Sequence, residues 1–271
     1  MIEQDVTDRF AAGVAILRAW GLTVEVPDIA GRTGTLPYLA GDDDVRRDEL
    51  KAAWAGTARA VVAARGGHGC LRVLEDWEWP RRPDPPWLVG FSDLTALQWS
   101  LASIGVGSLH GPAVVSLAAE PDWSRERMRT ILFGEPVDDL HGDEGVPGRA
   151  SGRLMAANMA VATAMFGTRW MPNLDGAILV LEDVNESPFR VDRLFTQWRM
   201  NGIFDRVAAL ALGRFTHPDT DLMDEVLHDR VHDLGLPVLM GLPIGHDGPN
   251  AALPVGADAT IDTAAGTLSI S

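Results

Sequence analysis

The sequence predicts an α/β fold in which an open, mostly parallel sheet is followed by a second region of different texture. Short apolar runs alternate with helical patterns through the first half of the chain. Residues 134–152 are rich in Gly, Pro and acidic residues and have no apolar period, whereas the tail from Pro237 is a series of short extended pieces. Repeated strand-then-helix units are typical of open α/β sheets, whose loops gather at the carboxyl ends of the strands.

The elements of the first half follow from the spacing of apolar residues. Phe10, Val14 and Leu17 lie on one helical face, and Gly21 is a stop signal for that helix. The run at residues 60–64 is apolar without alternation, which predicts a strand buried on both faces. Further helices are expected at residues 42–55, 71–77 and 93–104. Further extended segments are expected at residues 22–26, 87–89 and 109–114.

The second half continues the alternation before the extended tail. Residues 154–166 form an Ala- and Met-rich stretch that we interpret as a helix. Two more helices are expected at residues 191–200 and 221–232, and buried strands at residues 177–181 and 207–212. The sequence therefore predicts two domains joined by a linker, without internal repeats.

Composition narrows the class of partner. The chain has 271 residues, 46% of them hydrophobic, and a formal net charge of −15, which disfavours nucleic acid or an anionic membrane as the main partner. A single cysteine excludes an internal disulfide, and the first residues carry no basic region followed by an apolar core. We therefore expect a cytoplasmic protein that acts on a small molecule.

The stretch WLVGFSDLTALQW, residues 87–99, places Ser92 on a strand-to-helix turn. A serine there can be lifted out of a sheet toward a substrate, as in the nucleophile elbow G-x-S-x-G. Only half of that motif is present, because Leu94 stands in place of the second glycine. The alternative is that Ser92 caps the following helix, although Asp93 could cap it equally well.

A serine nucleophile needs a base and an acid that orients the base. His246 follows an extended piece in the Gly- and Pro-rich loop GLPIGHDGPNAALPVG, and Glu182 closes the apolar run AILVLE. The alternatives are an exposed loop histidine and a carboxylate that caps a turn or meets Arg190 or Arg193. Both residues follow predicted strands, which is where active sites of α/β sheets gather.

Other residues offer competing chemistry. Cys70 lies beside His68 and could be a cysteine nucleophile, although a lone cysteine is more often a small buried apolar residue. The acidic residues at 138–144 could indicate a metal, but acids in a Gly- and Pro-rich linker usually form solvated surface. Asp183 is interpreted as a turn residue.

With these residues in view, the chain resembles the LD-carboxypeptidases, serine peptidases that include muramoyl-tetrapeptide carboxypeptidase and the microcin C immunity peptidases. The match runs from about residue 38 to the C-terminus, in five segments. These segments are YLAGDDDVRRDEL, ARGGHGCLRVL, VGFSDLTAL with the later LHGPAV, ILVLEDVNESPFRVDRLFTQWRMNGIFDRVAALALGRF, and GLPIGHDGPNAALPVGADATID. Two departures are GGHGC and AANM, where the family often has GGYGS and GGNL.

The resemblance implies a fold, a partner and a domain arrangement. The fold would be a Rossmann-like N-terminal domain with a mostly parallel sheet beside a smaller, β-rich α+β C-terminal domain. On this basis we expect an N-terminal domain of residues 1–134, a linker at 135–152 and a C-terminal domain of residues 153–271. The resemblance also implies a homodimer that needs no metal or cofactor.

The resemblance further implies that Ser92 is the nucleophile, Glu182 the orienting acid and His246 the general base. The backbone N–H groups of Gly67 and Asp93 are then candidates for the oxyanion hole. The candidates for binding the substrate are Arg65, His68, His110 and Asn158.

Two substrates fit such a site. The first is a cytoplasmic muropeptide tetrapeptide, whose L,D-amide bond would be cleaved through an acyl-enzyme to release a C-terminal D-amino acid. The second is a peptidyl-nucleotide conjugate of the microcin C type, for which stacking partners such as Trp123 and Trp170 would be needed. A non-catalytic binding protein is a third reading, disfavoured by the complete Ser, Glu and His set.

Overall fold

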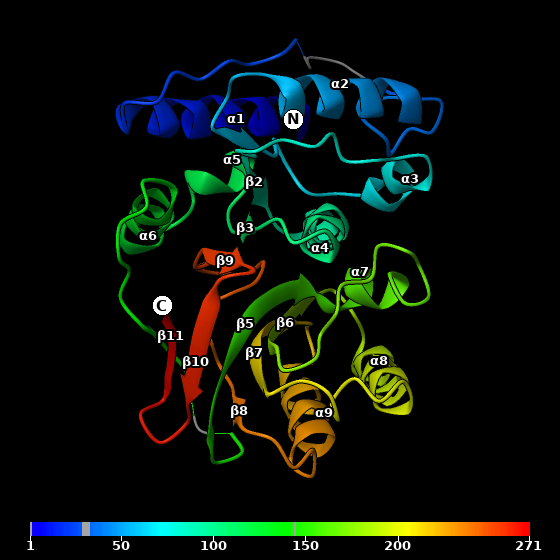
Figure 1. Ribbon diagram of the computed structural model, residues 1–271, viewed down its shortest axis with the longest axis vertical. Helices are drawn as coiled ribbons and strands as arrows, with labels where there is room; N and C mark the ends of the chain where they lie inside the picture. Colours follow the sequence, from blue (N-terminus) through cyan, green and yellow to red (C-terminus); the bar gives the residue numbers. More distant parts are fainter. Residues whose placement is uncertain (1, 29–32, 144) are drawn as a thin grey trace.

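The computed structural model describes residues 2–28, 33–143 and 145–271, and within them the strands form two sheets (Figure 1). The strand order is β1-β2-β3-β9 in the first sheet and β4-β11-β10-β5-β6-β7-β8 in the second. The predicted α/β fold is confirmed. No helix in the described ranges is long and apolar enough to span a membrane.

The first sheet is built mainly from the first half of the chain. Its parallel strands are β1 (Ala60–Val62), β2 (Trp87–Gly90) and β3 (Ser108–His110), and β9 (Leu253–Val255) runs antiparallel to β3. The helices of this half are α1 (Ile2–Ala19), α2 (Asp43–Ala55), α3 (Cys70–Glu75), α4 (Thr95–Ser103), α5 (Val114–Leu117) and α6 (Asp122–Leu132). A short 3-10 helix, η1 (Ser92–Leu94), joins β2 to α4.

The second sheet is larger and mixed. Strands β5 (Arg149–Asn158), β6 (Ile178–Val184), β7 (Ala209–Thr216) and β8 (Val238–Leu239) are parallel. Strands β10 (Asp258–Asp262), β11 (Thr267–Ile270) and β4 (Leu140–His141) continue the sheet by antiparallel pairing. Its helices are α7 (Met159–Ala164), α8 (Pro188–Met200) and α9 (Thr220–Val231).

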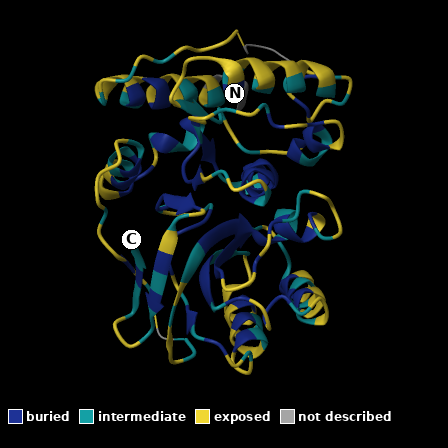
Figure 2. Ribbon diagram, viewed as in Figure 1, coloured by how far each residue is buried: buried dark blue, intermediate teal, exposed yellow. Residues whose placement is uncertain are grey.

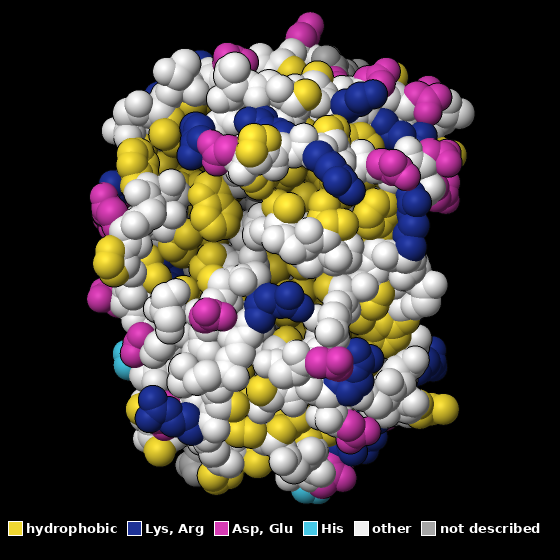
Figure 3. Space-filling view, viewed as in Figure 1, with side chains coloured by type: hydrophobic (Ala, Val, Ile, Leu, Met, Phe, Trp, Pro, Cys, Tyr) yellow, Lys and Arg dark blue, Asp and Glu magenta, His cyan; other side chains and the backbone are white. Residues whose placement is uncertain are grey.

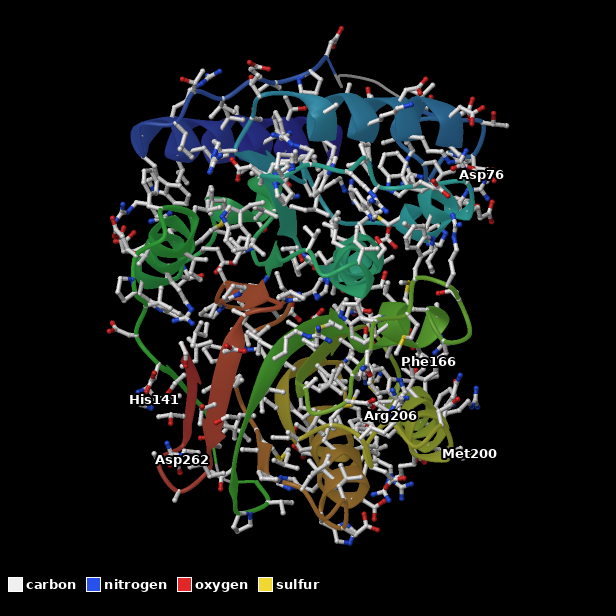
Figure 4. All side chains as sticks on the ribbon, in the orientation of Figure 1. Asp76, His141, Phe166, Met200, Arg206 and Asp262 are labelled. Atoms are coloured by element: carbon white, nitrogen blue, oxygen red, sulfur yellow. The ribbon has the colours of Figure 1, made fainter. Side chains whose placement is uncertain are left out.

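The largest hydrophobic core extends across both halves, and helix α4 lies between them (Figures 1 and 2). Trp99 of α4 is fully buried, and its indole N–H donates to the Ala156 carbonyl of β5 at 3.0 Å. Its ring centroid lies 6.3 Å from that of Trp198 on α8, whose own ring centroid lies 5.1 Å from that of Phe166. Phe166, labelled in Figure 4, lies just beyond helix α7. The helix that follows Ser92 is therefore anchored on the strand that leads to Asn158.

The prediction of a helix at residues 154–166 is wrong for its first half. Residues 149–158 form β5, and only Met159–Ala164 form helix α7. Residues 149–153 of β5 pair with β10 and residues 154–158 pair with β6, and the last five residues are buried. Ala and Met are good helix formers, but intrinsic propensity is small per residue, and pairing with β6 in a buried sheet overrides it.

The first half also departs from the expected strands at three places. Of residues 109–114 only the first two lie in β3, and Val114 already belongs to helix α5. Residues 22–26 form no strand, although Leu22 and Val24 pack against the smaller core cluster. Strand β1 is half-buried rather than buried on both faces, because within the described ranges it is the edge of the first sheet. The apolar run at 60–64 therefore reflects an edge strand that packs against helices.

The expected linker and C-terminal segment each contribute to a sheet. Strand β4 and the start of β5 lie within residues 134–152. Strand β9 lies far along the chain but belongs to the first sheet, because Leu253 pairs with His110. The chain therefore returns to the first sheet directly after the loop that carries His246.

Candidate active site

Ser92 occupies a tight turn at the end of strand β2. Its φ of +63° lies in the left-handed region, which among the described non-glycine residues is shared only by Asn185. Such a conformation costs free energy and often marks a functional turn. Neither η1 nor α4 has a side-chain cap hydrogen bond, so the interpretation of Ser92 or Asp93 as a helix cap is wrong.

The Gly-rich loop lies directly against this turn. A Cβ atom on Gly66 would lie only 3.2 Å from Cβ and 3.4 Å from Oγ of Ser92. The Asp93 carboxylate accepts a hydrogen bond from the backbone N–H of Cys70 at 2.9 Å. The side chain of Asp93 therefore ties the turn to the loop, and Gly66 leaves room beside the serine.

Glu182 and His246 form a hydrogen-bonded pair. His246 Nδ1 lies 2.8 Å from Glu182 Oε2, and Glu182 is almost fully buried at the end of β6. The ring of Phe91, the residue before the serine, lies 4.7 Å from the imidazole of His246. In the described part of the chain, Ser92 Oγ has no hydrogen-bond partner. The structure thus brings the acid to the base and seats the base beside the residue that precedes Ser92.

The electrostatic surroundings of His246 favour its protonated form. Burial alone would lower the pKa of His246, but the hydrogen bond and negative charge of Glu182 outweigh it. The charges of Asp183 and Asp247 act in the same direction, so the pKa lies above its ordinary value of 6.5. A base with these neighbours accepts a proton readily and is held in one orientation.

Asn158 ends strand β5 next to the acid, and its side-chain groups are all engaged within the protein. Its amide nitrogen donates to Glu182 Oε1 at 3.3 Å and to Asp183 Oδ1 at 2.9 Å, and its oxygen accepts the N–H of Val161 at 3.1 Å. These contacts orient Glu182. They leave no amide proton for a substrate carboxylate in this arrangement, in contrast to the expected binding role.

Asp183 supports the same corner of the site. Its carboxylate accepts the backbone N–H groups of Ala160 and Val184, each at 2.8 Å, in addition to the amide of Asn158. Burial raises the pKa of Asp183 to about 6 despite these bonds. The position of Asp183 beside Glu182, near a strand end, is the only sequence signal for this role. Interpreting Asp183 as a turn residue misses its contact with Asn158.

His110 lies inside the protein rather than on an open surface. It ends strand β3 with no exposed area, and neither ring nitrogen has a hydrogen-bond partner among the described residues. Burial, with a contribution from His246, lowers the pKa of His110 to about 3. Its ring lies 6.3 Å from that of Phe91, so it is a neutral imidazole behind the phenylalanine.

Three of the predicted residues are exposed in the Gly-rich loop: Arg65, Gly67 and His68. Arg65 donates to the neighbouring Gly66 carbonyl at 3.3 Å, and the rings of His68 and Tyr38 meet edge to face with their centroids 5.6 Å apart. Gly67 has a φ of +139°, a conformation that favours glycine. Arg65 and His68 are therefore available to a ligand from this loop.

The competing nucleophile is buried, and the candidate stacking residues line surface hollows away from the triad candidates. Cys70 is buried, and burial together with Asp93 raises the pKa of its thiol well above the usual value, which argues against a cysteine nucleophile. Trp170 lines a surface hollow of about 510 Å³ with Trp54 and Trp79, and Trp123 lines another of about 480 Å³ with Trp20. None of the three triad candidates lines either hollow.

Acidic and basic side chains are interspersed on the face shown in Figure 3. Within the described residues, no three His, Cys, Asp or Glu side chains gather as metal ligands.

Comparison with known proteins gives matches over nearly the whole chain. Residues 1–111 match the LD-carboxypeptidase N-terminal domain, and residues 151–261 match the LD-carboxypeptidase C-terminal domain. A candidate carboxypeptidase of Synechocystis sp. is 47% identical over 95% of this chain and 87% of its own length. The Microcin C7 self-immunity protein MccF of Escherichia coli is 25% identical over 94% of this chain and 86% of its own.

A solved structure gives the same result for the fold. The muramoyltetrapeptide carboxypeptidase from Oxalobacter formigenes superposes with a TM-score of 0.82 and 27% identity, over 97% of this chain and 94% of that chain. Both family domains and the overall fold are therefore matched. The chain belongs to the LD-carboxypeptidase family of peptidases.

Proposed function

We propose that the protein is a serine carboxypeptidase in which Ser92, Glu182 and His246 act as nucleophile, orienting acid and general base. The observation that carries this proposal is the 2.8 Å hydrogen bond between His246 Nδ1 and the buried Glu182, beside the strained turn of Ser92. A base oriented by an acid next to a serine on a strand-to-helix turn is the arrangement that serine acyl transfer requires.

The proposed reaction proceeds through an acyl-enzyme. Because Nδ1 donates to Glu182, Nε2 of His246 is the nitrogen that takes the proton of Ser92 as Oγ attacks the scissile carbonyl. His246 then protonates the leaving amine as the C–N bond breaks. Water, deprotonated by the same imidazole, hydrolyses the ester, and the proton returns to Ser92.

Residues of the Ser92 turn and of the Gly-rich loop are assigned to the negative charges of the reaction, the oxyanion and the substrate carboxylate. We assign the oxyanion hole to the backbone N–H groups of Gly67 and Asp93, where each donor is worth about 3 kcal/mol of barrier. Arg65, exposed in the same loop, is the cation that we assign to the free carboxylate of the substrate. We also propose that His68, exposed in this loop, contacts the substrate.

The substrate that we propose is a cytoplasmic muropeptide tetrapeptide, which would lose its C-terminal D-amino acid. The name of the structural relative from Oxalobacter formigenes supports this choice. The second candidate is an immunity-type hydrolysis of a peptidyl-nucleotide conjugate, which the similarity to MccF favours. We rank it second because Trp123 and Trp170 line hollows that none of the three triad residues shares.

The arrangement of the whole protein is proposed on the same basis. We propose an N-terminal domain of residues 1–134, a linker at residues 135–152 and a C-terminal domain of residues 153–271. We also propose that the protein works as a homodimer in the cytoplasm. Size-exclusion chromatography with light scattering tests the dimer, and a mass of one chain would contradict it.

The test of the reaction is release of D-alanine from a purified LD-tetrapeptide, run beside a peptidyl sulfamoyl-adenylate. We expect the tetrapeptide to be cleaved and Ser92→Ala to lower kcat by at least about 10⁴-fold. Cleavage of the sulfamoyl-adenylate alone would move the proposal to the second candidate. D-alanine release by Ser92→Ala at the parental rate would contradict the serine mechanism.

Cys70→Ala is the matched control for the rival nucleophile. Because the thiol is buried and its pKa is raised, we expect this variant to retain kcat within about three-fold of the parent. Loss of activity in a folded Cys70→Ala protein would support a cysteine nucleophile and contradict the serine mechanism.

A further inference from the structure

The loop that carries His246 is closed at its base by main-chain bonds. The N–H of Arg214 donates to the Ile244 carbonyl at 2.8 Å, and the N–H of Ala251 donates to the Pro243 carbonyl at 2.9 Å. Between these two points the chain has no regular structure. The position of the imidazole therefore depends on its bond to Glu182 and on the hydrogen bonds that hold the loop between these two points.

A buried carboxylate from the other half of the molecule reaches this loop. Glu120 lies between α5 and α6, is 7% exposed, and accepts the backbone N–H of Asn250 at 2.9 Å. The same oxygen accepts the hydroxyl of Ser124 at 2.8 Å, and that hydroxyl also lies 3.3 Å from the Asn250 carbonyl. Burying an acid costs free energy, so its retention here calls for a reason beyond packing.

Asn250 links Glu120 to the residue that precedes His246. Its side-chain oxygen accepts the N–H of Gly245 at 3.2 Å, and Gly245 directly precedes His246. Arg214 supports the loop from β7 by donating to the Pro249 carbonyl at 2.7 Å. Gly248 has a φ of +109°, and a Cβ there would lie 3.1 Å from the guanidinium carbon of Arg214, so the loop is closely packed on that side.

We propose that Glu120 is a positioning residue for the reaction, acting through Asn250 and Gly245 to hold His246 at its distance from Ser92. Ser92 follows a strand of the first sheet, whereas Glu182 holds His246 from the second sheet. Glu120 follows α5 in the same half as Ser92, so its bond to Asn250 ties the nucleophile's half to the loop of the base. This inference rests on the proposed serine mechanism.

Its role differs from that of the Glu182 carboxylate. Glu182 touches the imidazole and fixes its tautomer, whereas the hydrogen bonds of the Glu120 carboxylate go to the Asn250 backbone and the Ser124 hydroxyl. A displacement of about 1 Å in a reacting group can cost about 100-fold in rate. Loss of the Glu120 contact is therefore expected to lower kcat more than it changes KM.

The first test compares three variants of the complete chain under conditions in which each is fully folded. Glu120→Ala is expected to lower kcat for tetrapeptide cleavage by about 10- to 100-fold with KM within about three-fold. Glu120→Gln is expected to restore most of the rate, because its amide oxygen can accept the same two donors. Glu126→Ala, on the exposed surface of α6, is the matched control and should equal the parent.

A double-mutant cycle separates positioning from general stability. Asn250→Ala keeps the backbone N–H that meets Glu120 but removes the acceptor of Gly245. If the two residues act in one chain of contacts, the double variant is expected to lose little more rate than either single variant. Additive losses, or a Glu120→Ala variant that unfolds more easily but keeps the parental kcat, would overturn the inference.

A second readout keeps this test independent of the substrate assignment. Phosphonylation of Ser92 by a fluorophosphonate needs the same base but no peptide, and it should slow in Glu120→Ala as kcat does. If the parent cleaves no tetrapeptide but its Ser92 reacts in this way, the substrate is wrong and Glu120 is still tested. An unchanged phosphonylation rate in Glu120→Ala would refute the positioning role.

Discussion

At the scale of single residues, Ser92 combines a polar side chain with a backbone conformation that suits glycine. Its φ of +63° is unfavourable for a residue with a Cβ, and the turn between β2 and η1 maintains it. The neighbouring Gly66 leaves the space that a side chain would otherwise take from the hydroxyl. The serine is thus retained at some cost in stability.

This cost can be measured with two inactive variants. Ser92→Gly relieves the strain and Ser92→Ala does not, so we expect the glycine variant to have a free energy of unfolding about 1 kcal/mol higher than the alanine variant. Urea denaturation of both proteins measures the difference. Equal stabilities, or a more stable alanine variant, would show that the turn is not strained.

The charge of Glu182 sets the pH dependence of the reaction. Only the neutral imidazole acts as the base, so kcat/KM should rise with pH through a midpoint that lies above 6.5, the ordinary pKa of histidine. Glu182→Gln removes the charge that raises the pKa, which should move the midpoint to lower pH. It should also lower the plateau by about 10³- to 10⁴-fold, as loss of an orienting acid does in serine triads. A midpoint that stays in place in Glu182→Gln would contradict this assignment.

How far these residues could be predicted depends on whether their signal is local. Glu182 and His246 each follow an apolar run, and their pairing follows from where strands end. Glu120 and Asn250 carry no such signal, because 130 positions separate two residues that meet only in the folded chain. The sequence places Asn158 near the site correctly, but it does not show that the side-chain amide donates to Asp183 and not to a substrate.

At the scale of elements, tertiary contact decides where local preference is weak. The strands and helices with clear apolar patterns lie within a few residues of their predicted positions, as for α2 and α8. Residues 154–158 could not be assigned from sequence alone, because their strand conformation depends on pairing with β6, which lies about 20 positions further along the chain. The predicted strand at residues 22–26 is wrong for a related reason. Leu22 and Val24 pack against the smaller core cluster, but the segment pairs with no described strand.

Helix α1 gives a case in which helix propensity and packing predict opposite results. Gly13 lies where a Cβ would come within 2.0 Å of the Val114 carbonyl oxygen of α5. Propensity alone favours Gly13→Ala by about 1 kcal/mol, whereas overpacking costs about 1–3 kcal/mol. With a backbone atom this close we expect net destabilisation, measured by urea denaturation. A more stable Gly13→Ala protein would mean that α1 and α5 are not in this contact.

At the scale of the whole molecule, the proposed triad joins two sheets. Ser92 directly follows strand β2 of the first sheet, and Glu182 of the second sheet holds His246, so the reaction depends on how the two halves are fixed. The contacts that link the two halves include Trp99 bonded to Ala156, strand β9 paired with β3, and Glu120 bonded to Asn250. The alternation of strands and helices predicted the class of fold, but these links join distant segments and were not predictable from local pattern.

The most direct test of the triad is the site and rate of modification by a fluorophosphonate, followed by intact mass and peptide mapping. We predict one adduct per chain, on Ser92, formed at least about 100-fold more slowly in both His246→Ala and Glu182→Gln. An adduct on another residue, or a Ser92 that reacts equally fast in His246→Ala, would contradict the account.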